Sequence, residues 1–220
     1  MRRLFCLFLL SLLPLAVGAQ GVDRQGIPAD VYYWMPDFGQ GLIFFNGQAP
    51  ARGLLNICAL DNTVRFLDKE GKELAATNDE HIVKVQIDTV SFVRDEGVFY
   101  RLYPVTLGLQ IAVRRDIQIL QDSKKGAYGG DTRTSSVKEY TSVYADGVTV
   151  SLSSGREYPH TVSETLYLFS GGRLYPLTKR GLRKCFPDRK DDIDAWLSAG
   201  RSIPETLPEV EVMLRQILQL

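Results

Sequence analysis

The chain has 220 residues, of which 45% are hydrophobic and 24% are charged, and its 26 Lys and Arg residues balance its 26 Asp and Glu residues. This composition is typical of a folded domain and argues against a disordered chain. A net charge of zero provides no electrostatic footprint for nucleic acid or for an anionic membrane surface.

The first twenty residues, MRRLFCLFLLSLLPLAVGAQ, have the pattern of a secretory signal peptide. Arg2 and Arg3 precede an apolar run that is too short to cross a membrane, and small residues follow it. We expect residues 1–19 to be removed by cleavage after Ala19. The mature chain would then carry 24 basic and 26 acidic residues and no membrane span.

Residues 20–177 show the periodicity of a β-rich domain. Short apolar segments alternate with polar turns, several of which contain glycine, such as Asp68–Gly71, Asp95–Gly97 and Ser170–Gly172. In the segment 82–87 we expect Val83, Val85 and Ile87 to share one face. The candidate strands are Leu42–Phe45, Val64–Leu67, Glu73–Ala75, Ile82–Ile87, the apolar positions from Phe92 to Leu102, Leu109–Leu120, Glu139–Val143, Thr149–Leu152, Leu166–Phe169 and Arg173–Leu177. This spacing predicts an antiparallel meander.

Residues 178–220 change to a helical period and predict about three short helices, so the fold class is α+β. Thr178 is the expected N-cap of the first helix, Asp188 of the second, and Thr206 begins the third. The third helix carries an apolar stripe that consists of Val210, Met213, Leu214, Ile217 and Leu218. We expect this stripe to dock on the preceding sheet. The alternative is docking on a neighbouring chain, which would make the protein an oligomer.

Residues that could carry catalysis or bind metal are sparse. The two histidines, His81 and His160, stand alone at a strand start and in a turn, without the spacing of metal ligands. The mature chain keeps Cys58 and Cys185, for which two buried thiols are favoured over a disulfide. No G-x-S-x-G motif occurs and no carboxylate pair stands out. The sequence therefore predicts no cofactor, no metal and no identifiable catalytic residue.

The candidate binding residues are aromatic. Tyr33 and Trp34 belong to the cluster Tyr32–Phe38, which either begins the core, the favoured interpretation, or forms an exposed ridge for a partner. Tyr128 lies among glycines in the polar segment Gln121–Lys138, where an aromatic side chain can contact a partner or a sugar.

Four stretches of the chain resemble exported proteins of unknown function from Bacteroidota. They are Ala19-Gln20, Phe66–Leu74, Gly126–Gly129, and Leu174–Leu177 with its continuation to Phe186–Lys190. The resemblance implies a location in the periplasm or at the outer surface of a Gram-negative cell, and it implies no activity.

These observations favour a cell-envelope binding or assembly protein without catalytic activity, which contacts a protein partner or a surface glycan. The alternative is an envelope hydrolase whose acidic residues converge only in the fold. Two close carboxylates with raised pKa values would favour the hydrolase. A broad apolar patch or an exposed aromatic ridge would favour binding.

Overall fold

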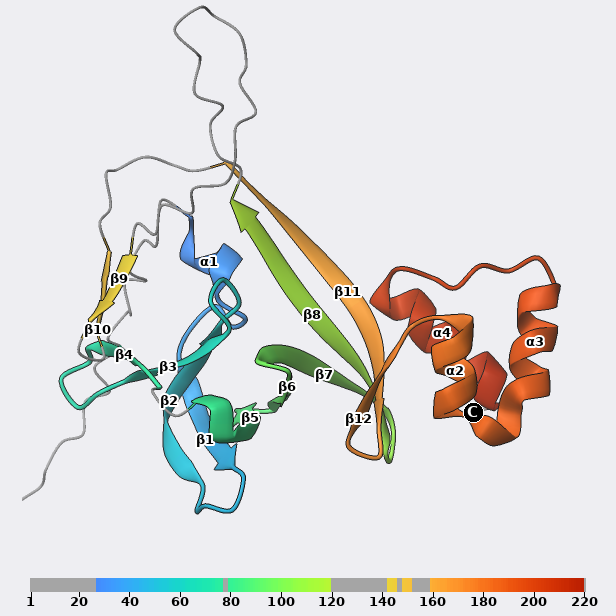
Figure 1. Cartoon of the computed structure of the whole chain (residues 1–220), viewed down its shortest axis with the longest axis horizontal. Coiled ribbons are helices and arrows are strands. Elements are labelled where there is room, and N and C mark those ends of the chain that lie inside the picture. Colours follow the sequence, from blue (N-terminus) through green and yellow to red (C-terminus); the bar gives the residue numbers. More distant parts are fainter. Residues whose placement is uncertain (1–26, 77–78, 120–141, 146–147, 152–158, 220) are drawn as a thin grey trace, which may run out of the picture.

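Ten strands form one antiparallel sheet in a computed structural model that describes residues 27–76, 79–119, 142–145, 148–151 and 159–219 (Figure 1). Its strands are β1 (Gly39–Phe45), β2 (Ala51–Cys58), β3 (Thr63–Leu67), β4 (Glu73–Ala75), β5 (Ile82–Ile87), β6 (Val90–Asp95), β7 (Val98–Thr106), β8 (Leu109–Ile119), β11 (His160–Ser170) and β12 (Arg173–Pro176). Their order is β12-β11-β8-β7-β6-β5-β1-β2-β3-β4, and β9 (Ser142–Ala145) pairs separately with β10 (Val148–Ser151). The sheet confirms the predicted antiparallel meander with two breaks, because β5 pairs with β1 and β8 pairs with β11.

The predicted hairpin turns coincide with residues that adopt a left-handed backbone. Gly171 and Gly172 have φ values of 57° and 75° and join β11 to β12. Glu96 and Gly97, with φ values of 46° and 83°, join β6 to β7 in the same way. Two consecutive residues with positive φ match the right-handed twist of the flanking strands, which is why glycine is favoured there.

The prediction that Val83 shares a face with Val85 and Ile87 is wrong. Lys84 is paired with Phe44 of β1, whereas Ile82 is paired with Phe45, so Val83 is an extra residue in β5. Such a β-bulge shifts the alternation of side chains by one residue. As a result Ile82 is buried on the same face as Val85 and Ile87, and the Val83 residue is 45% exposed.

Strand β11 begins six residues earlier than the sequence pattern predicted. His160 lies at its first position, paired with Ile119 of β8, and not in a turn. Residues 161–165 are exposed and lack an alternating apolar pattern. Backbone pairing with the long strand β8 therefore extends β11 where side-chain periodicity gives no signal.

The helical segment packs against the sheet of the same chain. It comprises α2 (Lys179–Cys185), a 3-10 turn η2 (Pro187–Arg189), α3 (Lys190–Ser198) and α4 (Leu207–Leu218), gathered beside β11 and β12 in Figure 1. In α4, Met213 and Leu214 are at most 1% exposed and join the same apolar core as Leu168 of β11. The predicted stripe is thus covered within the chain. None of the helices described is long and apolar enough to cross a membrane.

Two of the three predicted helix starts agree with the structure. The Thr178 hydroxyl accepts a hydrogen bond of 3.1 Å from the Gly181 amide, and Thr206 is the N-cap residue of α4. The prediction for Asp188 is wrong, because this residue lies inside η2 and the N-cap position of α3 falls on Arg189. Pro187 allows one tight turn between the helices, which moves the start of α3 beyond Asp188.

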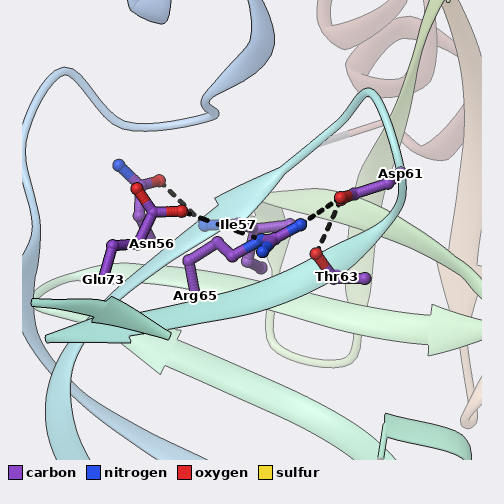
Figure 2. Close-up of polar contacts among 6 residues, drawn as sticks. All are labelled: Asn56, Ile57, Asp61, Thr63, Arg65 and Glu73. Carbon is purple, nitrogen blue, oxygen red and sulfur yellow. Dashed lines mark hydrogen bonds and ion pairs between the residues drawn. The ribbon is translucent and has the colours of Figure 1, made fainter. Parts of the chain in front are cut away.

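Asn56 of β2 and Arg65 of β3 form a buried polar pair (Figure 2), and Asn56 also bonds to the segment that precedes the sheet. Arg65 is 2% exposed and forms an ion pair with Asp61 and a longer one, of 3.9 Å, with Glu73. Asn56, paired with Arg65 across the strands, donates a hydrogen bond of 2.8 Å to the Met35 carbonyl and accepts one from the Met35 amide. These bonds satisfy buried polar groups and fix the chain near Met35 onto β2.

Candidate functional site

Tyr33 and Trp34 are part of the core, as the favoured interpretation predicted. They are 3% and 4% exposed and directly follow the short helix α1 (Ala29–Tyr32). The Trp34 ring meets the Phe92 ring edge-on at 5.8 Å, and the Tyr33 ring meets Phe38 at 5.5 Å. The alternative of an exposed ridge at these two residues is therefore wrong, because sheet side chains cover both rings. Tyr128 lies outside the described residues.

Arg115 of β8 explains how the segment with Tyr33 and Trp34 is held on the sheet. Its guanidinium carbon lies 4.4 Å from the centroid of the Trp34 ring, and its Nη1 donates a hydrogen bond of 3.1 Å to the Tyr33 carbonyl. Glu164 of β11 accepts from the same guanidinium at 3.0 Å. Because Arg115 stacks on the Trp34 indole and also bonds to Tyr33 and Glu164, its role is structural.

The two cysteines and the titratable groups offer little for catalysis. Cys58 is fully buried, Cys185 is half-buried, and both are thiols. Burial raises the pKa of the Cys185 thiol to about 11, opposed in part by a hydrogen bond with Ser170. A thiol with such a pKa is a poor nucleophile at neutral pH. No group of three or more His, Cys, Asp and Glu side chains within the described ranges could hold a metal ion.

The second face of the sheet carries a separate apolar cluster, which we call the outer-face cluster. Tyr100, Leu102 and Ala112 form its buried centre, and the rings of Tyr100 and Tyr167 meet edge-on at 5.3 Å. Burial raises the pKa of Tyr100. Its half-buried rim consists of Val93, Val98, Tyr167, Phe169 and Leu174. All members lie on strands, so no described helix packs on this cluster. The centre of the cluster is at most 7% exposed, so most of this apolar surface is covered by neighbouring side chains.

A shallow, open hollow of about 550 Å³ lies between α2, η2 and the start of α3; five of its six lining residues are cationic, although its surface is mostly apolar. We call it the basic hollow, and it is lined by Lys179, Arg180, Arg183, Lys184, Pro187 and Lys190. Arg180 and Lys184 are four residues apart on α2 and therefore lie on one face of that helix. The Thr178 cap and Pro187 set where α2 begins and ends, and so determine which side chains reach the hollow.

The cations of the basic hollow fall into two groups. Lys179 and Arg183 both pair with Asp194 of α3, the former at 3.0 Å. Arg180, Lys184 and Lys190 are exposed, and no carboxylate within the described part of the chain comes within 4.0 Å of them. The hydrogen bonds from Arg183 and Lys179 hold the pKa of Asp194 below its ordinary value. Three positive charges are thus left for an anionic ligand.

The basic hollow was missed from sequence although a signal for it exists. Three basic doublets occur within twelve residues, at Lys179-Arg180, Arg183-Lys184 and Arg189-Lys190. The apolar positions of this segment predict the helix, but they give no information about its cationic face. The overall charge of zero also conceals a local excess, because acidic residues elsewhere cancel it.

Comparison with known proteins finds no matching family model, no matching curated protein and no matching solved structure. What the protein does must therefore be argued from its own residues. The resemblance to exported proteins of Bacteroidota, and the location that it implies, stay predictions.

Proposed function

We propose that the protein is an exported cell-envelope binding protein without catalytic activity, and that it binds an anionic surface glycan through the basic hollow. The observation that carries this proposal is the group of three exposed cations, Arg180, Lys184 and Lys190, which line one concavity and pair with no carboxylate among the described residues. The export and the envelope location rest on the signal-like N-terminus.

Electrostatics supports a ligand in this place. Like charges four residues apart on a helix, such as Arg180 and Lys184, repel each other and weaken the helix slightly. Asp194 pairs with Lys179 and Arg183, whereas no carboxylate in the described part of the chain pairs with Arg180 or Lys184. An anionic group bound in the hollow would remove the repulsion and form charge-assisted hydrogen bonds, which are stronger than neutral ones.

The shape of the site favours a glycan over a protein partner. The hollow is shallow and open to solvent, and its volume of about 550 Å³ can hold a small anionic group at the surface. Specific protein interfaces instead bury about 800 Å² of largely flat surface on each partner. A charged sugar unit fits a concavity of this size.

The test compares retention of the full exported chain on isolated envelopes for three proteins. One is the wild type and one is the hollow variant Arg180→Ala/Lys184→Ala/Lys190→Ala. The third is a matched control, Arg52→Ala/Lys69→Ala/Lys72→Ala, which removes the same charges from exposed positions in β2 and the β3–β4 turn.

We expect the hollow variant to lose at least about tenfold in apparent affinity, and the control to stay within about twofold. Retention that survives protease treatment of the envelopes supports a glycan ligand. Equal retention of the hollow variant and the wild type would overturn the proposal, and loss of binding after protease treatment would replace the glycan by a protein partner.

A further inference from the structure

We infer that the anionic group recognised by the basic hollow is a compact phosphate, carried on a sugar as a monoester or a diphosphate. This inference rests on the proposed function, since it names the chemistry of the ligand at the same site. Three features support it: the number of cations that have no carboxylate partner among the described residues, the geometry of their side chains, and the acidic residues beside the hollow.

The charge of the site matches phosphate better than carboxylate. Three exposed cations, Arg180, Lys184 and Lys190, face one hollow without carboxylate partners among the described residues. A phosphate monoester carries a charge of about −1.5 to −2 at neutral pH and presents three strong acceptor oxygens. A single carboxylate carries one charge and two oxygens, and would leave two of the three cations uncompensated.

The residue types also suit a tetrahedral oxyanion. The Arg180 guanidinium has donors in a rigid fork that can bind two phosphate oxygens at once. The Lys184 and Lys190 ammonium groups are point charges on flexible chains and can approach the remaining oxygens from other directions. Behind them, Lys179 and Arg183 are held by Asp194, which gives the hollow a positive wall with fixed geometry.

Acidic residues beside the hollow restrict the ligand to a compact anion. Asp188 and Asp191 are exposed and flank Lys190 in sequence, and Asp192 pairs with Arg189 at 3.2 Å. Residues 178–219 contain eight basic and seven acidic side chains, so the helical segment as a whole is nearly neutral. An extended polyanion or an anionic membrane would meet these carboxylates, whereas a single phosphate group inside the hollow would not.

The experiment is calorimetric titration of the full exported chain with four probes. Glucose 1-phosphate and glucuronate form a matched pair that differs in the anionic group, pyrophosphate tests a diphosphate without sugar, and phosphatidylglycerol vesicles present phosphate on a surface. The proteins are the wild type, the hollow variant, the matched control and Arg180→Lys. The variant Arg180→Lys keeps the positive charge and removes the planar set of guanidinium donors.

We expect glucose 1-phosphate to bind at least about tenfold more tightly than glucuronate. The hollow variant should lose this binding, the matched control should keep it, and Arg180→Lys should weaken glucose 1-phosphate or pyrophosphate several-fold. Folding of each variant is checked by its thermal transition.

Equal affinity for glucuronate and glucose 1-phosphate, lost in the hollow variant, would overturn the phosphate inference and leave the proposed anionic-glycan function standing. Binding to vesicles without binding to glucose 1-phosphate would also overturn the phosphate inference, because the ligand would then be a lipid headgroup and not a sugar phosphate. If no probe binds, and the hollow variant is retained on envelopes as well as the wild type is, both proposals fail.

Discussion

Asp194 of α3 holds the ammonium group of Lys179 in α2 at 3.0 Å, and the same carboxylate also pairs with Arg183. This carboxylate connects two helices and pairs with two of the five cations that line the basic hollow, although the single negative charge of Asp194 offsets only one of their two positive charges. The hydrogen bonds from both cations keep the pKa of Asp194 below 3.8, so the carboxylate is charged at neutral pH. Asp194 therefore sets how much positive charge the hollow has left for a ligand.

Replacement of Asp194 by Asn should strengthen the binding of phosphate-bearing ligands several-fold, because it releases Lys179 and Arg183 toward the hollow. It should also lower the melting temperature slightly, since α2 and α3 lose a contact. Titration with glucose 1-phosphate measures the first effect. Asp191→Asn is the control, because Asp191 is exposed on the same helix and forms no ion pair with any described residue. An equal gain in both variants would show that only net charge matters.

The same residue gives a pH dependence. A carboxyl group whose pKa is lowered by folding stabilises the folded protein above the unfolded value and loses this contribution as the pH falls through the folded value. The difference in melting temperature between wild type and Asp194→Asn should thus stay constant from about pH 5 to 8 and shrink only below the ordinary pKa of 3.8. A difference that changes near neutral pH would contradict this assignment.

Arg115→Met should destabilise the protein by about 2 kcal/mol, because the guanidinium stacks on Trp34 and donates to the Tyr33 carbonyl. Urea unfolding followed by tryptophan fluorescence measures this change. Glu164→Gln is the comparison, because its side chain is 47% exposed and the ion pair with Arg115 is worth at most about 1 kcal/mol. If both variants lose the same stability, the stacking on Trp34 contributes nothing.

Leu214→Ala should cost about 3 kcal/mol, because the side chain is fully buried in the core that α4 shares with the sheet. Val212→Ala, at a position 54% exposed on the same helix, should stay within about 0.5 kcal/mol of the wild type. Denaturant unfolding gives both values. Truncation before Thr206 should abolish folding for the same reason. A folded monomer after this truncation would instead support docking of the helix on a second chain.

The Cys185 thiol should react slowly with iodoacetamide at pH 7.5, since its raised pKa of about 11 leaves little thiolate. The rate should increase with pH until the thiolate predominates, and mass spectrometry can assign the modified residue. Cys58 is fully buried and should react only after unfolding. Rapid modification of Cys185 at neutral pH would show that the thiol is more exposed or more acidic than this structure indicates.

Local features of the fold were predictable because their causes lie within a few residues of one another. The turns at Gly97 and Gly171-Gly172 need a left-handed backbone, and the Thr178 hydroxyl meets an amide only three residues away. The apolar stripe of α4 follows from helical periodicity alone. Such short-range patterns identified most of the strands and the helical segment, but they missed β2 (Ala51–Cys58) and α1 (Ala29–Tyr32).

Contacts between distant segments decided the rest. Val83 leaves the core because β1 pairs with β5 across a bulge, and His160 enters a strand because β8 lies beside it. The two partners that hold Trp34, which are Phe92 and Arg115, also come from distant strands.

The sequence by itself determined that the chain is a β-rich fold with a helical end and that basic doublets occur in α2. Only the tertiary structure decided which cations are paired, because Asp194 approaches α2 from another helix and pairs with Lys179 and Arg183 but not with Arg180 or Lys184. Charge pairing depends on distances of a few ångströms, and these are set by packing rather than by spacing along the chain.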